Sequence, residues 1–175
     1  MSWLLALAVI AIVGVAAFFF GRRYLANRGP RLVECPDNHQ PASVTVRAAA
    51  AAWGGSLQLD RCSRWPEKAS CGRECLSQIE RSPDGCLVRT MVTDWYADKS
   101  CSVCHQPIGR VDWFERKPGL MDAAGRVRQW QEVAPEMLPS VLSNHVPVCF
   151  DCCVSETFRR QHPELVLENP WRRAN

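Results

Sequence analysis

Cys101-Ser102-Val103-Cys104 is the stretch that decides the fold, and Cys149-Phe150-Asp151-Cys152 repeats its spacing later in the chain. Each C-x2-C pair places two thiols on one tight turn, and two such pairs supply the four ligands of a tetrahedral site. The spacing therefore predicts a zinc site formed by Cys101, Cys104, Cys149 and Cys152. The alternative to a metal is a set of buried or disulfide-bonded cysteines.

The segments between and after the two pairs predict a hairpin and a helix. Residues 110–116 are rich in β-forming side chains, and residues 126–133 alternate between polar and apolar. A short helical segment is expected at residues 135–142, and the second cysteine pair opens a helix that should end before Pro163. This order of cysteine turn, hairpin and cysteine pair at a helix start resembles a treble-clef zinc finger over residues 99–168.

The N-terminal residues 3–20 contain no charged or polar side chain. As a helix they would span about 27 Å, close to the roughly 30 Å of a hydrocarbon core. No Lys or Arg precedes this run, and three phenylalanines and two arginines end it, which favours a membrane anchor over a cleaved signal peptide. Because Arg22 and Arg23 follow the run, the positive-inside rule predicts a single-pass protein with the bulk of the chain in the cytoplasm.

This orientation determines how the ten cysteines are interpreted. In a reducing cytoplasm they are expected to bind metal instead of forming disulfides. In the opposite orientation the same cysteines would form a disulfide framework.

The predicted fold class is α+β, with one transmembrane helix followed by a small cysteine-rich domain stabilised by metal. The domain limits that we expect are an anchor at 1–24, a linker at 25–34, a cysteine-rich α+β region at 35–98, the zinc module at 99–168 and a basic tail at 169–175. Within the α+β region, the pattern predicts strands at 42–47 and 56–60, a helical turn at 48–52 and an apolar helical stripe at 87–95.

A second group of cysteines lies in the α+β region and comprises Cys35, Cys62, Cys71, Cys75 and Cys86. If a helix starts at residue 70 or 71, Cys71 and Cys75 lie on one face of it. A second metal centre with zinc or an iron–sulfur cluster is one interpretation, although the spacing matches no standard ferredoxin run. Reduced structural cysteines and disulfides are the others.

Several other chemistries fit short motifs less well. Cys101 to His105 satisfies the C-x-x-C-H haem signature, but haem attachment takes place outside the cytoplasm. No βαβ pattern surrounds Cys101, which disfavours a thioredoxin-like dithiol. The adjacent thiols of Cys152 and Cys153 suggest thiol or metal-handling chemistry as a weaker hypothesis. The candidate histidine ligands rank below the cysteines and are His39, His145 and His162.

The sequence favours a non-enzymatic function. We find no phosphate-binding loop, no metalloprotease motif and no nucleophile elbow. The formal net charge is +3, and no basic stripe with interleaved aromatics indicates nucleic acid. The expected function is a zinc-binding accessory or docking subunit of a membrane complex, with contacts supplied by tryptophans such as Trp113, Trp130 and Trp171. Electron transfer through an iron–sulfur cluster is the alternative.

Overall fold

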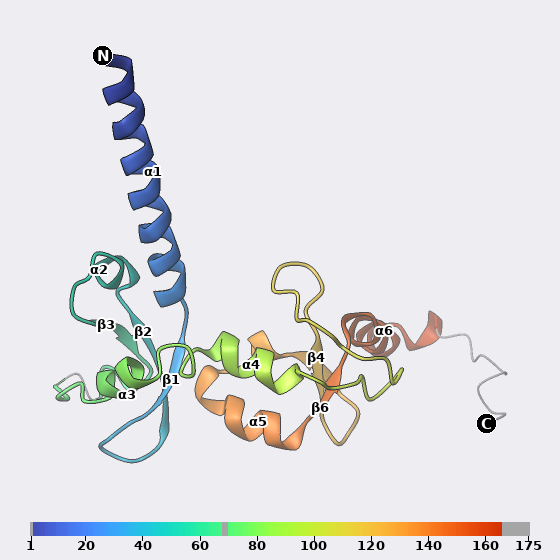
Figure 1. Ribbon diagram of the computed structural model, residues 1–175. Coiled ribbons are helices and arrows are strands. Elements are labelled where there is room, and N and C mark those ends of the chain that lie inside the picture. The colour runs from blue at the N-terminus through green and yellow to red at the C-terminus, as the bar shows by residue number, and fades with distance from the viewer. Residues whose placement is uncertain (1, 68–69, 166–175) are drawn as a thin grey trace. The chain divides into compact units, whose positions relative to one another are not determined.

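A computed structural model describes residues 2–67 and 70–165 of the chain as a mixture of helices and small sheets (Figure 1). The chain divides into two compact units, Met1–Met91 and Val92–Asn175, called here the N-terminal unit and the C-terminal unit. The predicted basic tail and Trp171 lie outside the described residues.

The apolar N-terminal run forms the single helix α1, Ser2–Asn27. Its segment Trp3–Asn27 is long and apolar enough to cross a membrane, although a signal sequence would have the same properties. Figure 1 shows α2, Ala48–Ala52, beside the C-terminal part of α1. The ring centroids of Phe20 on α1 and Trp53 after α2 lie 5.0 Å apart.

Arg31 fixes the point at which the chain leaves α1. Its guanidinium donates to the carbonyl oxygens of Asn27 at 2.8 Å and Ala26 at 3.2 Å, and the residue is fully buried. These bonds satisfy carbonyl groups that the end of a helix leaves without partners. The positive charge also interacts favourably with the negative, C-terminal end of the helix dipole. Because Arg31 is also the first residue of strand β1, the helix is tied directly to the sheet.

The N-terminal unit contains an antiparallel sheet in the order β1-β2-β3. The strands are β1 (Arg31–Glu34), β2 (Pro41–Val46) and β3 (Leu59–Cys62), and the short helix α3 (Leu76–Arg81) follows. Ala42, Val44 and Val46 alternate along β2 and are buried against Ile79 of α3. The predicted strand at 42–47 and helical turn at 48–52 are confirmed, and the strand predicted at 56–60 lies slightly later.

The prediction that Cys71 and Cys75 share a helix face is wrong. Helix α3 begins only at Leu76, and Cys75 is its capping residue. Arg73 adopts a left-handed backbone conformation with φ of 58°, which an α-helix does not accept. Cys71 therefore lies in the loop that precedes the helix.

The C-terminal unit contains a second antiparallel sheet, in the order β5-β4-β6. Its strands are β4 (Gly119–Met121), β5 (Val127–Gln129) and β6 (Val146–Val148). Helix α5 (Leu138–Asn144) and helix α6 (Phe150–Gln161) confirm the two predicted helices of this region. The remaining elements are α4 (Val88–Tyr96), which crosses the unit boundary, and the 3-10 helices η1 (Trp130–Glu132), η2 (Pro135–Met137) and η3 (Pro163–Leu165).

The strand predicted at residues 110–116 is instead a loop, and the first strand of the hairpin is β4. The side chain of Asp112 accepts hydrogen bonds from the backbone N–H groups of Phe114 at 2.8 Å and Glu115 at 3.2 Å. Because these donors are satisfied locally, the segment has no need of a strand partner. The second predicted strand is shorter than expected and turns into η1 after Gln129.

Gly119 packs closely against α6 in the C-terminal unit. A Cβ atom added there would lie 2.6 Å from Sγ and 3.2 Å from Cβ of Cys153 on α6. The buried Tyr96 donates its hydroxyl to the carbonyl of the same glycine at 2.8 Å. Gly119 is therefore held by this hydrogen bond as well as by its contact with Cys153, and the strand cannot shift to admit a larger side chain without disturbing one of them.

We expect Gly119→Ala to destabilise the C-terminal unit by about 1–3 kcal/mol, the usual cost of overpacking a core. Thermal unfolding of the full-length protein in detergent measures the loss. The double variant Gly119→Ala/Cys153→Ala should recover part of it, because the sulfur at 2.6 Å is gone while the Cβ contact remains. If the losses of stability in Gly119→Ala and Cys153→Ala simply add up in the double variant, the two residues do not interact and the proposed contact is contradicted.

Candidate metal centre

Cys101 and Cys104 lie on a tight turn that the backbone closes. The N–H of Cys101 donates to the carbonyl of Gln106 at 2.8 Å, and the N–H of His105 donates to the carbonyl of Cys101 at 2.9 Å. His105 adopts a positive φ of 59°, which lets the chain reverse. The N–H of Val103 also lies 3.4 Å from the sulfur of Cys101. This turn, residues 101–107, is called here the Cys101 turn.

Cys149 and Cys152 lie at the start of α6. Cys149 is the capping residue that joins β6 to the helix, and Cys152 belongs to the first helical turn. Ser102 connects this segment to the Cys101 turn, because its N–H and its hydroxyl both donate to the carbonyl of Pro147, at 2.9 and 3.0 Å. The two cysteine pairs are therefore held together by hydrogen bonds that involve no sulfur.

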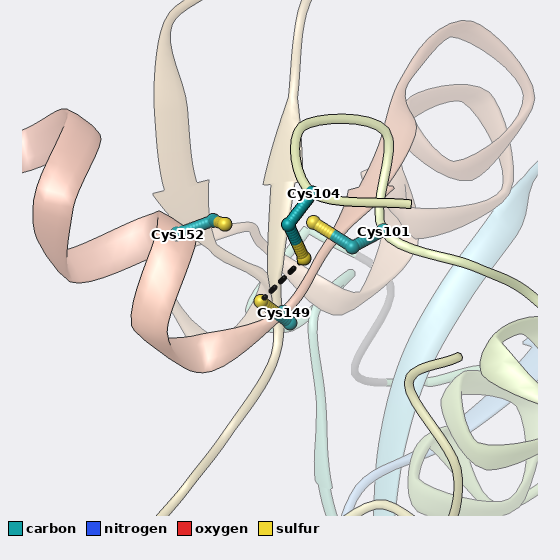
Figure 2. A group of neighbouring side chains, drawn as sticks. All are labelled: Cys101, Cys104, Cys149 and Cys152. Atoms are coloured by element: carbon teal, nitrogen blue, oxygen red, sulfur yellow. Dashed lines mark hydrogen bonds between the residues drawn. The ribbon is translucent and has the colours of Figure 1, made fainter. Parts of the chain in front are cut away.

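The four sulfur atoms lie within 4.8 Å of one another and point toward a common centre (Figure 2). Sγ of Cys104 and Sγ of Cys149 are 3.8 Å apart. A tetrahedral ion with metal–sulfur bonds of about 2.3 Å separates its ligands by roughly 3.8 Å. In the described part of the chain, this is the one group of cysteine, histidine and acidic side chains gathered this closely. These four cysteines could hold a metal ion.

The surroundings shift the pKa values of Cys101, Cys149 and Cys152 in different directions. Burial opposes ionisation of Cys101, but backbone N–H groups of Cys104, Cys149 and Val103 overcome it and lower the pKa of this thiol to about 6. Burial raises the pKa of Cys149 and, together with the neighbouring thiols, that of Cys152. The surrounding backbone thus favours the thiolate form of Cys101. Cys149 and Cys152 would have to release their protons when a cation binds, because metal coordination requires thiolates.

Cys153 is a packing residue that the sequence did not distinguish from a ligand. It is buried, its sulfur is directed at Gly119, and it forms a core cluster with Cys101 and Val148. The close packing of a glycine against a cysteine from a distant helix leaves no signal in the local sequence.

The other candidate residues of this region lie elsewhere. His105 is exposed in the Cys101 turn, and a β-bridge between Ser100 and Pro107 closes this turn. The pair Cys101 and Cys104 does not open a helix. His145 contacts Arg128 at 3.0 Å and His162 contacts Glu164 at 3.4 Å.

In the N-terminal unit, four of the five predicted cysteines line one cavity of about 270 Å³, namely Cys35, Cys62, Cys71 and Cys75. Cys86 does not line it, and its sulfur lies 3.7 Å from the carbonyl of Gln78. His39 points to solvent and contacts Glu34 at 2.6 Å. All ten cysteines lie in the described part of the chain, and none is paired in a disulfide.

Comparison with protein-family models, with curated proteins and with solved structures finds no match for this chain. The chemistry of the site therefore has to be inferred from its own residues.

We expect alanine substitution of any one of Cys101, Cys104, Cys149 and Cys152 to remove the metal from this site and to lower the unfolding temperature. A tetrahedral site that loses one of four thiolates loses most of its affinity, and metal binding is coupled to folding. Elemental analysis of the full-length protein measures the bound metal. Cys153→Ala is the matched control, adjacent in sequence but outside the cluster, and it should keep the metal. Loss of metal in this control alone would contradict the assignment.

Proposed function

We propose that the chain is a membrane-anchored zinc protein that serves as a non-enzymatic docking subunit of a larger membrane complex. The observation that carries this proposal is the cluster of four sulfurs on a chain that begins with an apolar helix long enough to cross a membrane. Each part of the proposal has its own support.

Zinc is the metal that the donor set favours. Four cysteine thiolates in a tetrahedral arrangement are typical of structural zinc sites, which leave no coordination position for water or substrate. The order of elements supports a treble-clef-like module. The Cys101 turn supplies one pair of ligands, the β4–β5 hairpin follows, and the start of α6 supplies the second pair. A closed site of this kind stabilises a fold and does not activate a water molecule.

A docking role is supported by the loop that precedes β4. Arg116 binds the carboxylate of Asp151 at 2.6 Å, and Asp151 lies between the two cysteines of the second pair. Asp112 orders the other end of the loop. Between these two attachments Phe114 is 91% exposed. Aromatic side chains, Phe included, are enriched at protein interfaces, so an exposed one on an ordered loop supports a docking role.

The tryptophans considered from the sequence offer less to a partner. Trp113 and Trp130 are half-buried and pack edge to face, with ring centroids 5.2 Å apart. Phe114 is therefore the residue that we assign to the docking surface.

The membrane part of the proposal places the bulk of the chain in the cytoplasm. Arg22 and Arg23 near the C-terminal end of α1 support this orientation. The contact between Trp53 and Phe20 supports an anchor that stays attached, because it gives the end of α1 an aromatic partner at the depth where such side chains gather.

Electron transfer to a membrane partner is the second candidate function. The cysteine-lined cavity of the N-terminal unit favours it, since an iron–sulfur cluster is held by cysteine thiolates. A visible absorption spectrum separates the two functions, because zinc is colourless and iron–sulfur clusters are not.

The membrane and metal parts are tested on the full-length chain with a fluorescent protein at its C-terminus. We expect it to remain in alkali-washed membranes with its N-terminal segment uncleaved, to fluoresce as a cytoplasmic fusion does, and to contain zinc. A cleaved, soluble product would show that α1 is a signal sequence and would overturn the anchor.

The docking part is tested with Phe114→Ser. We expect the wild-type chain, solubilised from its own membranes, to migrate in a native gel as part of a larger assembly, and Phe114→Ser to abolish this while keeping its metal. Val154→Ser on α6 is the matched control, since Val154 is 51% exposed but lies outside the loop. A wild-type chain that migrates alone, or an unchanged Phe114→Ser assembly, would rule out the docking surface.

A further inference from the structure

The Cys35 turn of the N-terminal unit, residues 35–41, repeats the backbone of the Cys101 turn. The N–H of Cys35 donates to the carbonyl of Gln40 at 2.9 Å, as that of Cys101 does to Gln106 at 2.8 Å. The N–H of His39 donates to the carbonyl of Cys35 at 2.9 Å, the same bond that His105 makes to Cys101.

Backbone conformation and sequence extend this match. His39 and His105 have positive φ values of 54° and 59°. Each histidine is followed by Gln and Pro. The two turns therefore have the sequences C-P-D-N-H-Q-P at residues 35–41 and C-S-V-C-H-Q-P at residues 101–107. The N-terminal unit therefore contains a second copy of the turn that presents Cys101 to the candidate metal centre.

The two copies differ at one position. Asn38 occupies the place of Cys104, and its side-chain oxygen accepts a hydrogen bond from the N–H of Gln40 at 3.1 Å. The Cys35 turn thus keeps its shape while supplying one sulfur instead of two. A four-thiolate site built on it needs three further cysteines from other segments.

Three further cysteines line the same cavity as Cys35. Cys62 ends β3 and is in register with Val44 of β2, Cys71 lies in the loop before α3, and Cys75 caps that helix. Cys75 is buried in the core cluster of this unit, and Cys35 and Cys62 pack against the same cluster. Three of the four cysteines therefore meet at one place, and Cys71 joins them at the cavity.

The lining of the cavity is not that of a simple apolar core. Two arginines and two acidic residues line it together with the cysteines, namely Arg64, Arg73, Asp37 and Glu74. Cys71 is exposed to solvent, which a cysteine that served only to fill the core would not be. Cys86, the fifth cysteine of this unit, lies outside this lining.

We propose that this cavity is a second metal centre, a four-thiolate site formed by Cys35, Cys62, Cys71 and Cys75. The proposal does not depend on the function of the C-terminal unit or on its metal. The shared ligand chemistry fits a single zinc ion or an iron–sulfur cluster. The four cysteines line the cavity, and their sulfurs do not gather within 4.8 Å of one another as those of the C-terminal cluster do.

The test is elemental and sulfide analysis, with a visible spectrum, of the full-length chain purified in detergent without oxygen. Cys71→Ala is the main variant, because Cys71 is exposed and its truncation leaves the core intact. Cys86→Ala is the matched control, a cysteine of the same unit that does not line the cavity. A Cys101→Ala background removes the C-terminal centre and isolates the second one.

If the second centre holds zinc, the wild-type chain contains about two zinc ions, and Cys71→Ala and Cys101→Ala each lower this to about one. If it holds an iron–sulfur cluster, Cys71→Ala loses the iron, the sulfide and the colour. Cys71→Ala still keeps the metal of the C-terminal centre, which is the metal that Cys101→Ala loses. Cys86→Ala keeps all the metal in both cases. The proposal is overturned if Cys101→Ala contains no metal, or if Cys71→Ala retains as much as the wild type. If Cys71→Ala keeps all of its metal while Cys101→Ala loses metal, the second centre is overturned and the C-terminal metal site is still supported.

Discussion

The crowding of four thiols around one point is the constraint on which the C-terminal unit depends. Two of the thiols have raised pKa values because burial disfavours their charge, and four thiolates this close cannot coexist without a cation. A bound metal converts this repulsion into stabilisation on the order of 10 kcal/mol. The unit is small and its sheet has three short strands, and burial of apolar side chains alone leaves a domain of this size only marginally stable.

The four cysteines of the cluster can be predicted from the sequence, because the signals that identify each pair lie in neighbouring residues. Each C-x2-C pair fixes its own turn, and the helix after Cys149 follows from residues adjacent to it. The hairpin was predicted, but its first strand was misplaced because the local bonds of Asp112 compete with strand pairing. Gly119 and Cys153 could not have been assigned, because their contact joins a strand and a helix that are distant in sequence. The finer fold thus depends on packing that no periodicity encodes.

The second cysteine group shows the opposite case, in which the sequence carries a signal that cysteine spacing does not reveal. The spacing of the cysteines alone does not show which four of these five would bind a metal ion. The repeated His-Gln-Pro after Cys35 and after Cys101 is a short internal repeat, and it pairs the two turns from sequence alone. The fold adds the cavity, which separates Cys86 from the other four.

The N-terminal unit joins the proposed second metal centre to the end of α1. Arg31 caps the last carbonyls of α1, strand β1 runs from Arg31 to Glu34, and Cys35 is the next residue. At about 3.3 Å per strand residue, the first ligand of the proposed centre lies roughly 13 Å along the chain from the start of β1. Arg31 is buried and the strand is paired along its whole length with β2, so residues 31–34 form an ordered connection between α1 and the Cys35 turn. A metal bound in the proposed centre would be linked to the end of α1 through one paired strand and the hydrogen bonds of Arg31. Because metal binding is coupled to folding, it would stabilise the sheet and its attachment to the helix together.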